Sequence, residues 1–72
     1  MSKVEVIVKV EDSSVDKMSE IARQCEQAGM RVEQQMKAMG MISGAVDKAN
    51  IGKIERIKGV SYVEISKPLS NA

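Results

Sequence analysis

The segment near the start of the chain constrains the fold most, because its valines alternate with other residues. Val4, Val6, Val8 and Val10 are each separated by one residue. β-Branched side chains at a period of two are typical of a strand with one buried face. A sheet with one buried face needs a second layer to cover it. The rest of the chain must therefore supply further strands and the elements that pack on them.

Two later segments have the period of a helix with one apolar side. In the first, apolar residues recur at spacings of three and four up to Gly29, which predicts a helix that ends there. These residues are Val15, Met18, Ile21, Ala22, Cys25 and Ala28. Ser13 and Asp16 have the spacing of a capping box and predict the helix start. In the second segment, Asp47 is the predicted N-cap and Gly59 the predicted end. Its expected inward residues are Ile51, Ile54 and Ile57.

A second strand is expected over residues 31–39, between the first helix and a glycine. Val32 and Met36 are its expected inward side chains, although its alternation is weaker than that of the first strand. Gly40 predicts the turn that ends it.

The third and fourth strands are expected over residues 41–46 and 60–65. Gly44 inside the third strand predicts a bulge or a close approach of another backbone segment. Pro68 is expected to stop the fourth strand, because proline has no N–H to donate to a ladder.

The predicted order is β-α-β-β-α-β in one domain over residues 1–65, followed by an extended tail over residues 66–72. Each helix has a single apolar stripe, so both are expected on one face of a four-stranded antiparallel sheet. Right-handed crossovers then give a ferredoxin-like α+β fold. The predicted core consists of Val4, Val6, Val8, Ile21, Cys25, Val32, Ile42, Ile54, Ile57 and Val63.

The composition of the chain argues against several classes of function. Eleven basic and ten acidic residues are interspersed and give a net charge of +1, so we expect no nucleic-acid or membrane partner. The chain has no histidine, and Cys25 lies on the apolar side of a helix. We therefore expect no enzyme activity, no metal site and no cofactor. Nothing resembles a signal peptide, which predicts a cytoplasmic protein.

The sheet face opposite the helices is the first candidate site. By alternation it carries Ile7, Met41, Tyr62 and Glu64, together with Glu5, Lys9, Ser43 and Ala45. An uncovered sheet face is normally strongly polar, and this one mixes apolar and charged residues. Two interpretations stay open. The apolar residues are either ordinary scattered surface residues or a docking surface for a partner.

A resemblance to a known family is carried by residues 29–36, residues 40–46, Ile54 and Ile57, and residues 59–64. Together these segments resemble the subtilisin-propeptide family, which includes stand-alone inhibitors of subtilisin-like serine proteases. It implies a ferredoxin-like domain that rests its open sheet face on two surface helices of the protease. It also implies a C-terminal segment that lies in the active-site cleft as a product-like strand. Such proteins inhibit the protease and can act as its folding chaperone.

The resemblance assigns roles to particular residues of this chain. Leu69, Ser70, Asn71 and Ala72 would occupy the fourth to the first specificity pockets of the cleft, held by β-augmentation. Ile7, Met41, Tyr62 and Glu64 would dock on the protease surface, with Glu64 at helix N-termini. Ile65 and Ser66 stand where the family usually has further acids, and Pro68 removes one hydrogen bond to the cleft. The free protein is expected to be a monomer.

Two other classes of function stay open. Amino-acid-binding regulatory domains of the ACT type share the β-α-β-β-α-β order and hold their ligand between the first strand and the first helix. That turn reads Glu11-Asp12-Ser13-Ser14 here, with the acid but without the glycine of that type. An oligomerising ferredoxin-like adaptor would use the same open sheet face.

Overall fold

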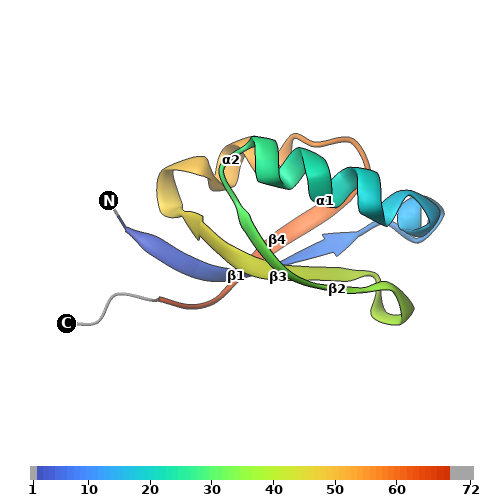
Figure 1. The fold of residues 1–72 in the computed structure, drawn as a ribbon, viewed down its shortest axis with the longest axis horizontal. Helices are drawn as coiled ribbons and strands as arrows, with labels where there is room; N and C mark the ends of the chain where they lie inside the picture. Colours follow the sequence, from blue (N-terminus) through green and yellow to red (C-terminus); the bar gives the residue numbers. More distant parts are fainter. Residues whose placement is uncertain (1, 69–72) are drawn as a thin grey trace.

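The computed structural model describes residues 2–68, which form a four-stranded antiparallel sheet with two helices on one face (Figure 1). The strands are β1 (Lys3–Val10), β2 (Arg31–Met36), β3 (Met41–Asp47) and β4 (Val60–Pro68). The helices are α1 (Met18–Gln27) and α2 (Ile51–Glu55). Short 3-10 helices span Asp12–Lys17, Lys37–Met39 and Lys48–Asn50. This α+β architecture is consistent with a ferredoxin-like type of fold.

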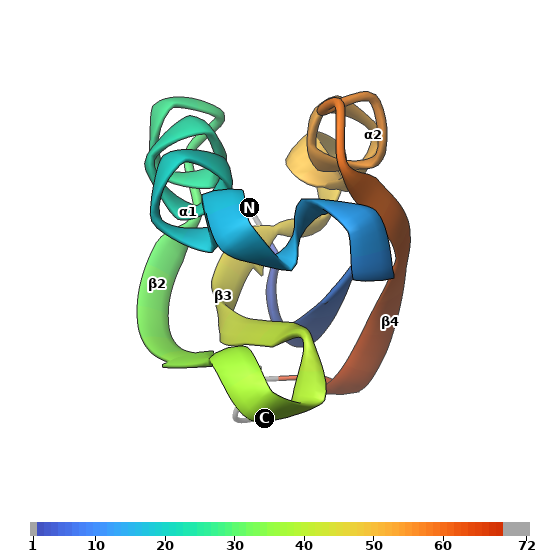
Figure 2. The same ribbon diagram turned by 90° about the vertical axis from the view of Figure 1, so that its right-hand side faces the viewer.

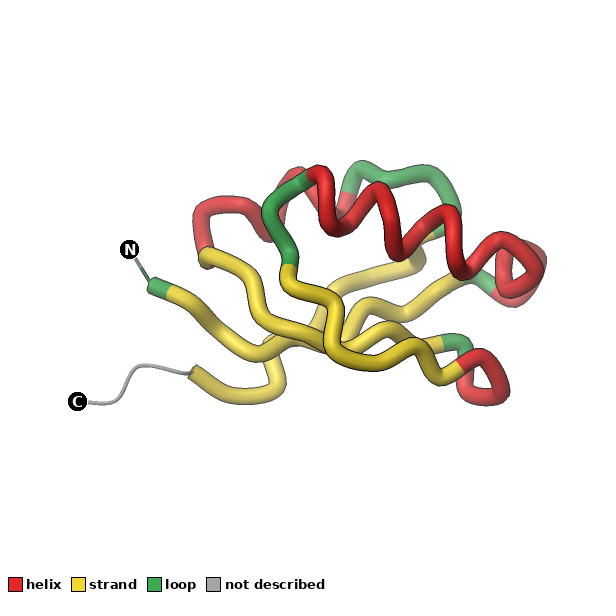
Figure 3. Tube along the Cα trace, viewed as in Figure 1, coloured by secondary structure: helices red, strands yellow, loops and turns green. Residues whose placement is uncertain are grey.

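The strand β1 lies inside the sheet, between β3 and β4, and β2 lies beside β3 at the opposite edge from β4. All three pairings are antiparallel. The helices cover one face of this sheet (Figure 3), with α1 above the β2 edge and α2 above the β4 edge (Figure 2). The four alternating valines of β1 are all buried beneath them, which confirms the predicted register of this strand.

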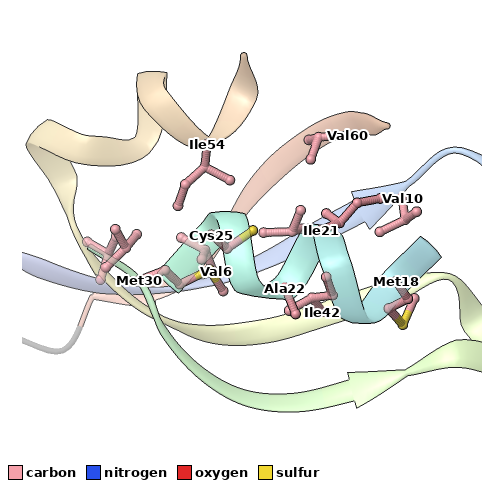
Figure 4. Packing of buried hydrophobic residues seen from close by; sticks show 13 residues of the cluster. Val6, Val10, Met18, Ile21, Ala22, Cys25, Met30, Ile42, Ile54 and Val60 are labelled. Carbon is pink, nitrogen blue, oxygen red and sulfur yellow. The ribbon is translucent and has the colours of Figure 1, made fainter. Parts of the chain in front are cut away.

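The core lies between the sheet and the two helices. Val6 of β1, Ile21 and Cys25 of α1, and Ile54 of α2 belong to one buried cluster (Figure 4). Most of the predicted core residues are buried, whereas Val32, Ile57 and Val63 are only partly buried against the cluster. Val32 and Val63 lie on the two edge strands, β2 and β4.

Gly44 is required by the close approach of β2 to β3. A Cβ atom at this position would collide with the backbone carbonyl oxygen of Arg31. This confirms the close backbone approach predicted for Gly44. Gly40, with a φ of 67°, adopts the left-handed conformation at the predicted turn.

The start of the first helix differs from the prediction. Residues 12–17 form a 3-10 helix, and α1 begins only at Met18. Neither Glu11 nor Lys17, the residues that precede these two helices, makes a side-chain cap hydrogen bond. The predicted capping box is therefore wrong, because Ser13 lies inside the 3-10 helix and not in front of it.

The predicted cap of the second helix is confirmed. The Asp47 Oδ1 atom accepts a hydrogen bond from the backbone N–H of Ala49, with a donor–acceptor distance of 3.0 Å. The turn that it caps is the 3-10 helix that runs directly into α2.

The strand β2 is shorter than predicted and contains an irregularity. It ends at Met36, and its pairing with β3 shifts between Val32 and Gln34, which leaves Glu33 as an extra residue. An extra residue reverses the alternation of the side chains that follow it. Met36 therefore pairs with Met41 on the open face of the sheet. Its predicted place in the core is wrong.

The strand β4 continues through Pro68, three residues beyond its predicted end. It pairs only with β1, and Pro68 lies opposite Val4. A proline is tolerated on such an edge strand. The first three residues of the predicted tail thus belong to the strand, in which Lys67 and Pro68 pair with β1 and Ser66 is an extra residue. Leu69–Ala72 lie outside the described residues.

Candidate functional site

The open face of the sheet, defined as the face opposite the helices, is crossed by rows of paired residues. The first row reads Met36, Met41, Lys9 and Tyr62 across β2, β3, β1 and β4. The second reads Gln34, Ser43, Ile7 and Glu64 in the same strand order. The register therefore places Ile7, Met41, Tyr62 and Glu64 on one face, as alternation predicted. What this face binds stays a prediction.

Apolar side chains gather in the first row and at the turn beside it. Tyr62 is 51% exposed, while Met36 and Met41 are half-buried. Met39, in the turn between β2 and β3, is 56% exposed. We define Met36, Met39, Met41 and Tyr62 as the methionine patch.

Lys9 connects the open face to the turn. Its Nζ atom donates a hydrogen bond to the backbone carbonyl oxygen of Met39, at a distance of 2.9 Å. The ammonium group is thereby directed to the end of the hairpin, and the aliphatic part of the side chain lies between Met41 and Tyr62 in the row. The lysine is half-buried, so it joins the apolar residues on both sides of it.

The opposite end of the open face is less apolar. Ala45 belongs to this face by register, yet it is only 6% exposed. Its pairing partners are Glu5 and Arg31, whose long side chains flank the small alanine. In the middle row, the half-buried Ile7 lies beside the exposed Glu64. The two exposed large apolar residues on this side of the sheet, Met39 and Tyr62, thus both belong to the methionine patch.

Met36 and Met39 were not predicted to belong to this surface. The polar run Glu33-Gln34-Gln35 was the available signal. Three consecutive polar residues leave no inward apolar position between Val32 and Met36, so the alternation is interrupted there, but the extra residue itself is seen only in the pairing with β3.

The residues predicted to enter a protease cleft, Leu69, Ser70, Asn71 and Ala72, lie outside the described residues. The strand that precedes them is described. It runs from Tyr62, beside Lys9, to Pro68, beside Val4. Six residues of extended strand span about 20 Å. The chain therefore reaches residue 68 at the end of the sheet far from the methionine patch.

The chemistry of Cys25 is limited by its position in the core. Its side chain is fully buried, as predicted. Burial, together with a smaller effect of the nearby Glu26 charge, raises the pKa of the Cys25 thiol to about 11. The thiol is therefore protonated at neutral pH and inaccessible, which suits a structural role. Within residues 2–68, no group of three His, Cys, Asp or Glu side chains is arranged to hold a metal ion.

A shallow depression lies on the helical side, close to the turn where an ACT-type domain holds its ligand. Its volume is about 280 Å³, and its lining residues are Ser14, Lys17, Glu20, Ile21, Gln24 and Lys58. Three of these six residues, Lys17, Glu20 and Lys58, are exposed to solvent, and only Ile21 is buried. The depression is therefore an open surface feature and not an enclosed ligand cavity.

Comparisons with known proteins assign no family to this chain. No family model matches it, and no curated protein sequence matches it. Among the described helices, none combines the length and the apolar character needed to cross a membrane. Function must therefore be inferred from the residues and their geometry.

Proposed function

We propose that this chain is an inhibitor of subtilisin-like serine proteases with a ferredoxin-like β-α-β-β-α-β fold. It docks on the protease by its open sheet face and presents Leu69–Ala72 to the active-site cleft. The protein itself catalyses no reaction.

The observation that carries the proposal is the concentration of exposed apolar surface at one end of the open face. Tyrosine and methionine are enriched at protein–protein interfaces relative to the rest of protein surfaces. The methionine patch contains Tyr62, at 51% exposure, together with Met39 and the two half-buried methionines. A patch of this composition favours a protein partner over a nucleic acid, which would require basic residues and stacking aromatics.

The direction of β4 supports a second contact by the C-terminal segment. The strand begins beside the patch and ends about 20 Å away, at the residue that precedes Leu69. Two weak contacts that belong to one rigid domain reinforce each other, because the first raises the effective concentration of the second. A short tail bound in this way inhibits although the isolated peptide would bind weakly.

Titration of purified subtilisin-like proteases with the protein tests the proposal. With a small peptide substrate, we expect competitive inhibition. Removal of Leu69–Ala72 is expected to abolish inhibition and to leave the melting temperature nearly unchanged, since the described core is formed by residues before Pro68. Undiminished protease activity at high micromolar concentrations of the intact protein, across several such enzymes, would contradict the proposal.

A matched pair of substitutions on β4 tests the docking face. Tyr62 faces Lys9 on the open face, whereas Ile65 pairs with Val6 on the helical side and is 46% exposed. Tyr62→Glu places a carboxylate opposite Lys9, so the fold is kept while apolar contact is lost. We expect the inhibition constant to rise about thirtyfold, which is typical of a central interface aromatic. Ile65→Glu should leave inhibition nearly unchanged, and equal effects of the two variants would count against the open face.

The other two classes of function predict different experimental outcomes. An oligomerising adaptor would show no inhibition, and Tyr62→Glu would abolish a concentration-dependent self-association seen by light scattering. An ACT-type domain would be stabilised by an amino acid in a thermal-shift screen, and substitution of Lys58 beside the depression would remove that effect.

A further inference from the structure

We propose that oxidation of the methionine patch by a peroxide switches off protease binding by this protein. The proposal rests on the proposed function, because it concerns the regulation of the same docking face. It assigns Met36, Met39 and Met41 as the sites of modification.

The strand register and the turn place the three methionines at one end of the sheet. Met36 and Met41 are cross-strand partners because the extra residue Glu33 reverses the alternation of β2. Met39 lies in the turn between these two strands and is the most exposed large apolar residue among those described. The hydrogen bond from Lys9 to the Met39 carbonyl ties this turn to the face. An oxidant in solution therefore meets the thioethers where a partner would dock.

The other two described methionines are protected. Met18 and Met30 are each 3% exposed and belong to the core (Figure 4). The two groups differ in exposure within one chain of 72 residues. The protein thus contains its own internal control, because mild oxidation should modify the patch and spare the core.

The chemical step is oxygen transfer to the thioether. The sulfur lone pair attacks one oxygen of hydrogen peroxide, the O–O bond breaks, and an S–O bond forms. A proton moves to the departing hydroxide, so one methionine and one peroxide give one methionine sulfoxide and one water. The product is polar and disrupts apolar interfaces, and it is reversible by methionine sulfoxide reductase with a dithiol as reductant. The thiol of Cys25 is fully buried and does not compete for the oxidant.

Graded treatment of the whole protein with hydrogen peroxide tests the proposal. At each dose, peptide mapping by mass spectrometry gives the oxidised fraction of every methionine, and protease titration gives the inhibition constant. We expect the inhibition constant to rise about tenfold or more in proportion to oxidation of the patch. The melting temperature should change little, and reductase with a dithiol should restore inhibition.

Two leucine variants separate the patch from the core. In M36L/M39L/M41L the patch has no oxidisable sulfur, and in M18L/M30L the core has none; leucine is close to methionine in volume. For each variant, the inhibition constant after peroxide is divided by its own value before treatment. We expect this ratio to stay near one for the patch variant and to rise for the core variant as in the parent protein.

Three results would overturn the proposal. The first is unchanged inhibition after full oxidation of the patch. The second is a loss of inhibition that follows the oxidation of Met1, Met18 or Met30 in the parent protein. The third is a failure of the reductase to restore inhibition. In each of these cases the untreated protein still inhibits, so only the regulation is rejected. If the untreated protein does not inhibit, the proposed function is rejected first and the regulation with it.

Discussion

Gly44 and Gly52 both lie in regular secondary structure, but only Gly44 has a steric reason to be glycine. A Cβ atom at Gly44 would collide with the Arg31 carbonyl oxygen of the neighbouring strand. A Cβ atom at Gly52, in α2, would meet no atom within 4 Å. The first glycine therefore sets how closely β2 approaches β3, and with it the geometry of the hairpin that carries the methionine patch.

Alanine at these two positions is expected to have opposite effects. Gly44→Ala should lower the free energy of unfolding by about 1–3 kcal/mol or more, because backbone must move to accept the methyl group. Gly52→Ala should raise it by up to about 1 kcal/mol, because glycine is unfavourable inside a helix. Urea unfolding of both variants measures the difference. Equal stability of the two variants would show that β2 can move away from β3 at no cost.

At the scale of elements, the helix starts differ in whether a side chain accepts a hydrogen bond from their free backbone N–H groups. Asp47 accepts a hydrogen bond from the N–H of Ala49 ahead of α2, whereas neither residue that precedes the helices of the 12–27 segment makes such a bond. Asp47 caps the 3-10 helix that runs directly into α2, and α2 itself has only five residues and no side-chain cap at Asn50, so this turn supports the start of a short helix.

Removal of the Asp47 side chain should therefore destabilise the protein. We expect Asp47→Ala to lower the free energy of unfolding by about 0.5–2 kcal/mol, the usual cost of losing an N-cap. Ser13→Ala removes a residue of the capping box that the sequence predicted, and it should cost almost nothing because Ser13 lies inside a 3-10 helix. Thermal or urea unfolding compares the two. A larger loss for Ser13→Ala would show that this hydroxyl forms a cap in solution.

The elements that could be predicted are those whose signals are local. The valines of β1 alternate in the sequence itself, and α1 ends at Gln27, just ahead of Gly29, as expected. The second helix is shorter than predicted, because α2 ends at Glu55 and a turn connects it to Gly59. The orientation of Met36 could not be predicted by counting, because the extra residue Glu33 is visible only in the pairing with β3. The last residues of β4 form a strand because they pair with β1, which is distant in the sequence. Local sequence signals therefore do not predict this extension.

The candidate site was predictable to the same extent. Met41 begins a regular stretch of β3, and β4 alternates regularly from Tyr62 to Ile65, although its pairing with β1 shifts just before Tyr62. The face of both residues therefore followed from the sequence. Met36 and Met39 depend on a bulge and on a turn, and they were assigned to the patch only from the structure.

At the scale of the whole molecule, Cys25 makes stability depend on alkaline pH. The folded protein raises the pKa of its thiol from the ordinary value of 9.0 to about 11, mainly by burial. Between these two values the folded state holds the proton that the unfolded state has lost. The contribution of the neutral thiol to the free energy of unfolding is thus fully present below pH 9.0, and it is lost as the pH rises toward about 11.

A comparison of the parent protein with Cys25→Ala isolates this effect from the titration of tyrosine and lysine. The variant should be less stable at every pH, because it leaves a cavity under α1. Between about pH 8 and about pH 10.5, however, the parent should lose more stability than the variant, since only the parent carries the thiol. The measurement is the urea midpoint at each pH. Parallel losses in the two proteins would mean that the thiol ionises without unfolding.

The central place of β1 has a consequence for how the protein is made. This strand is synthesised before the other three, but its partners β3 and β4 come from later in the chain. Contacts between distant parts of a sequence slow folding. During translation, the valine-rich strand β1 therefore has both edges unpaired until its partners are synthesised. Unpaired strand edges promote association with other nascent chains. The native sheet is complete only when the C-terminal strand has left the ribosome.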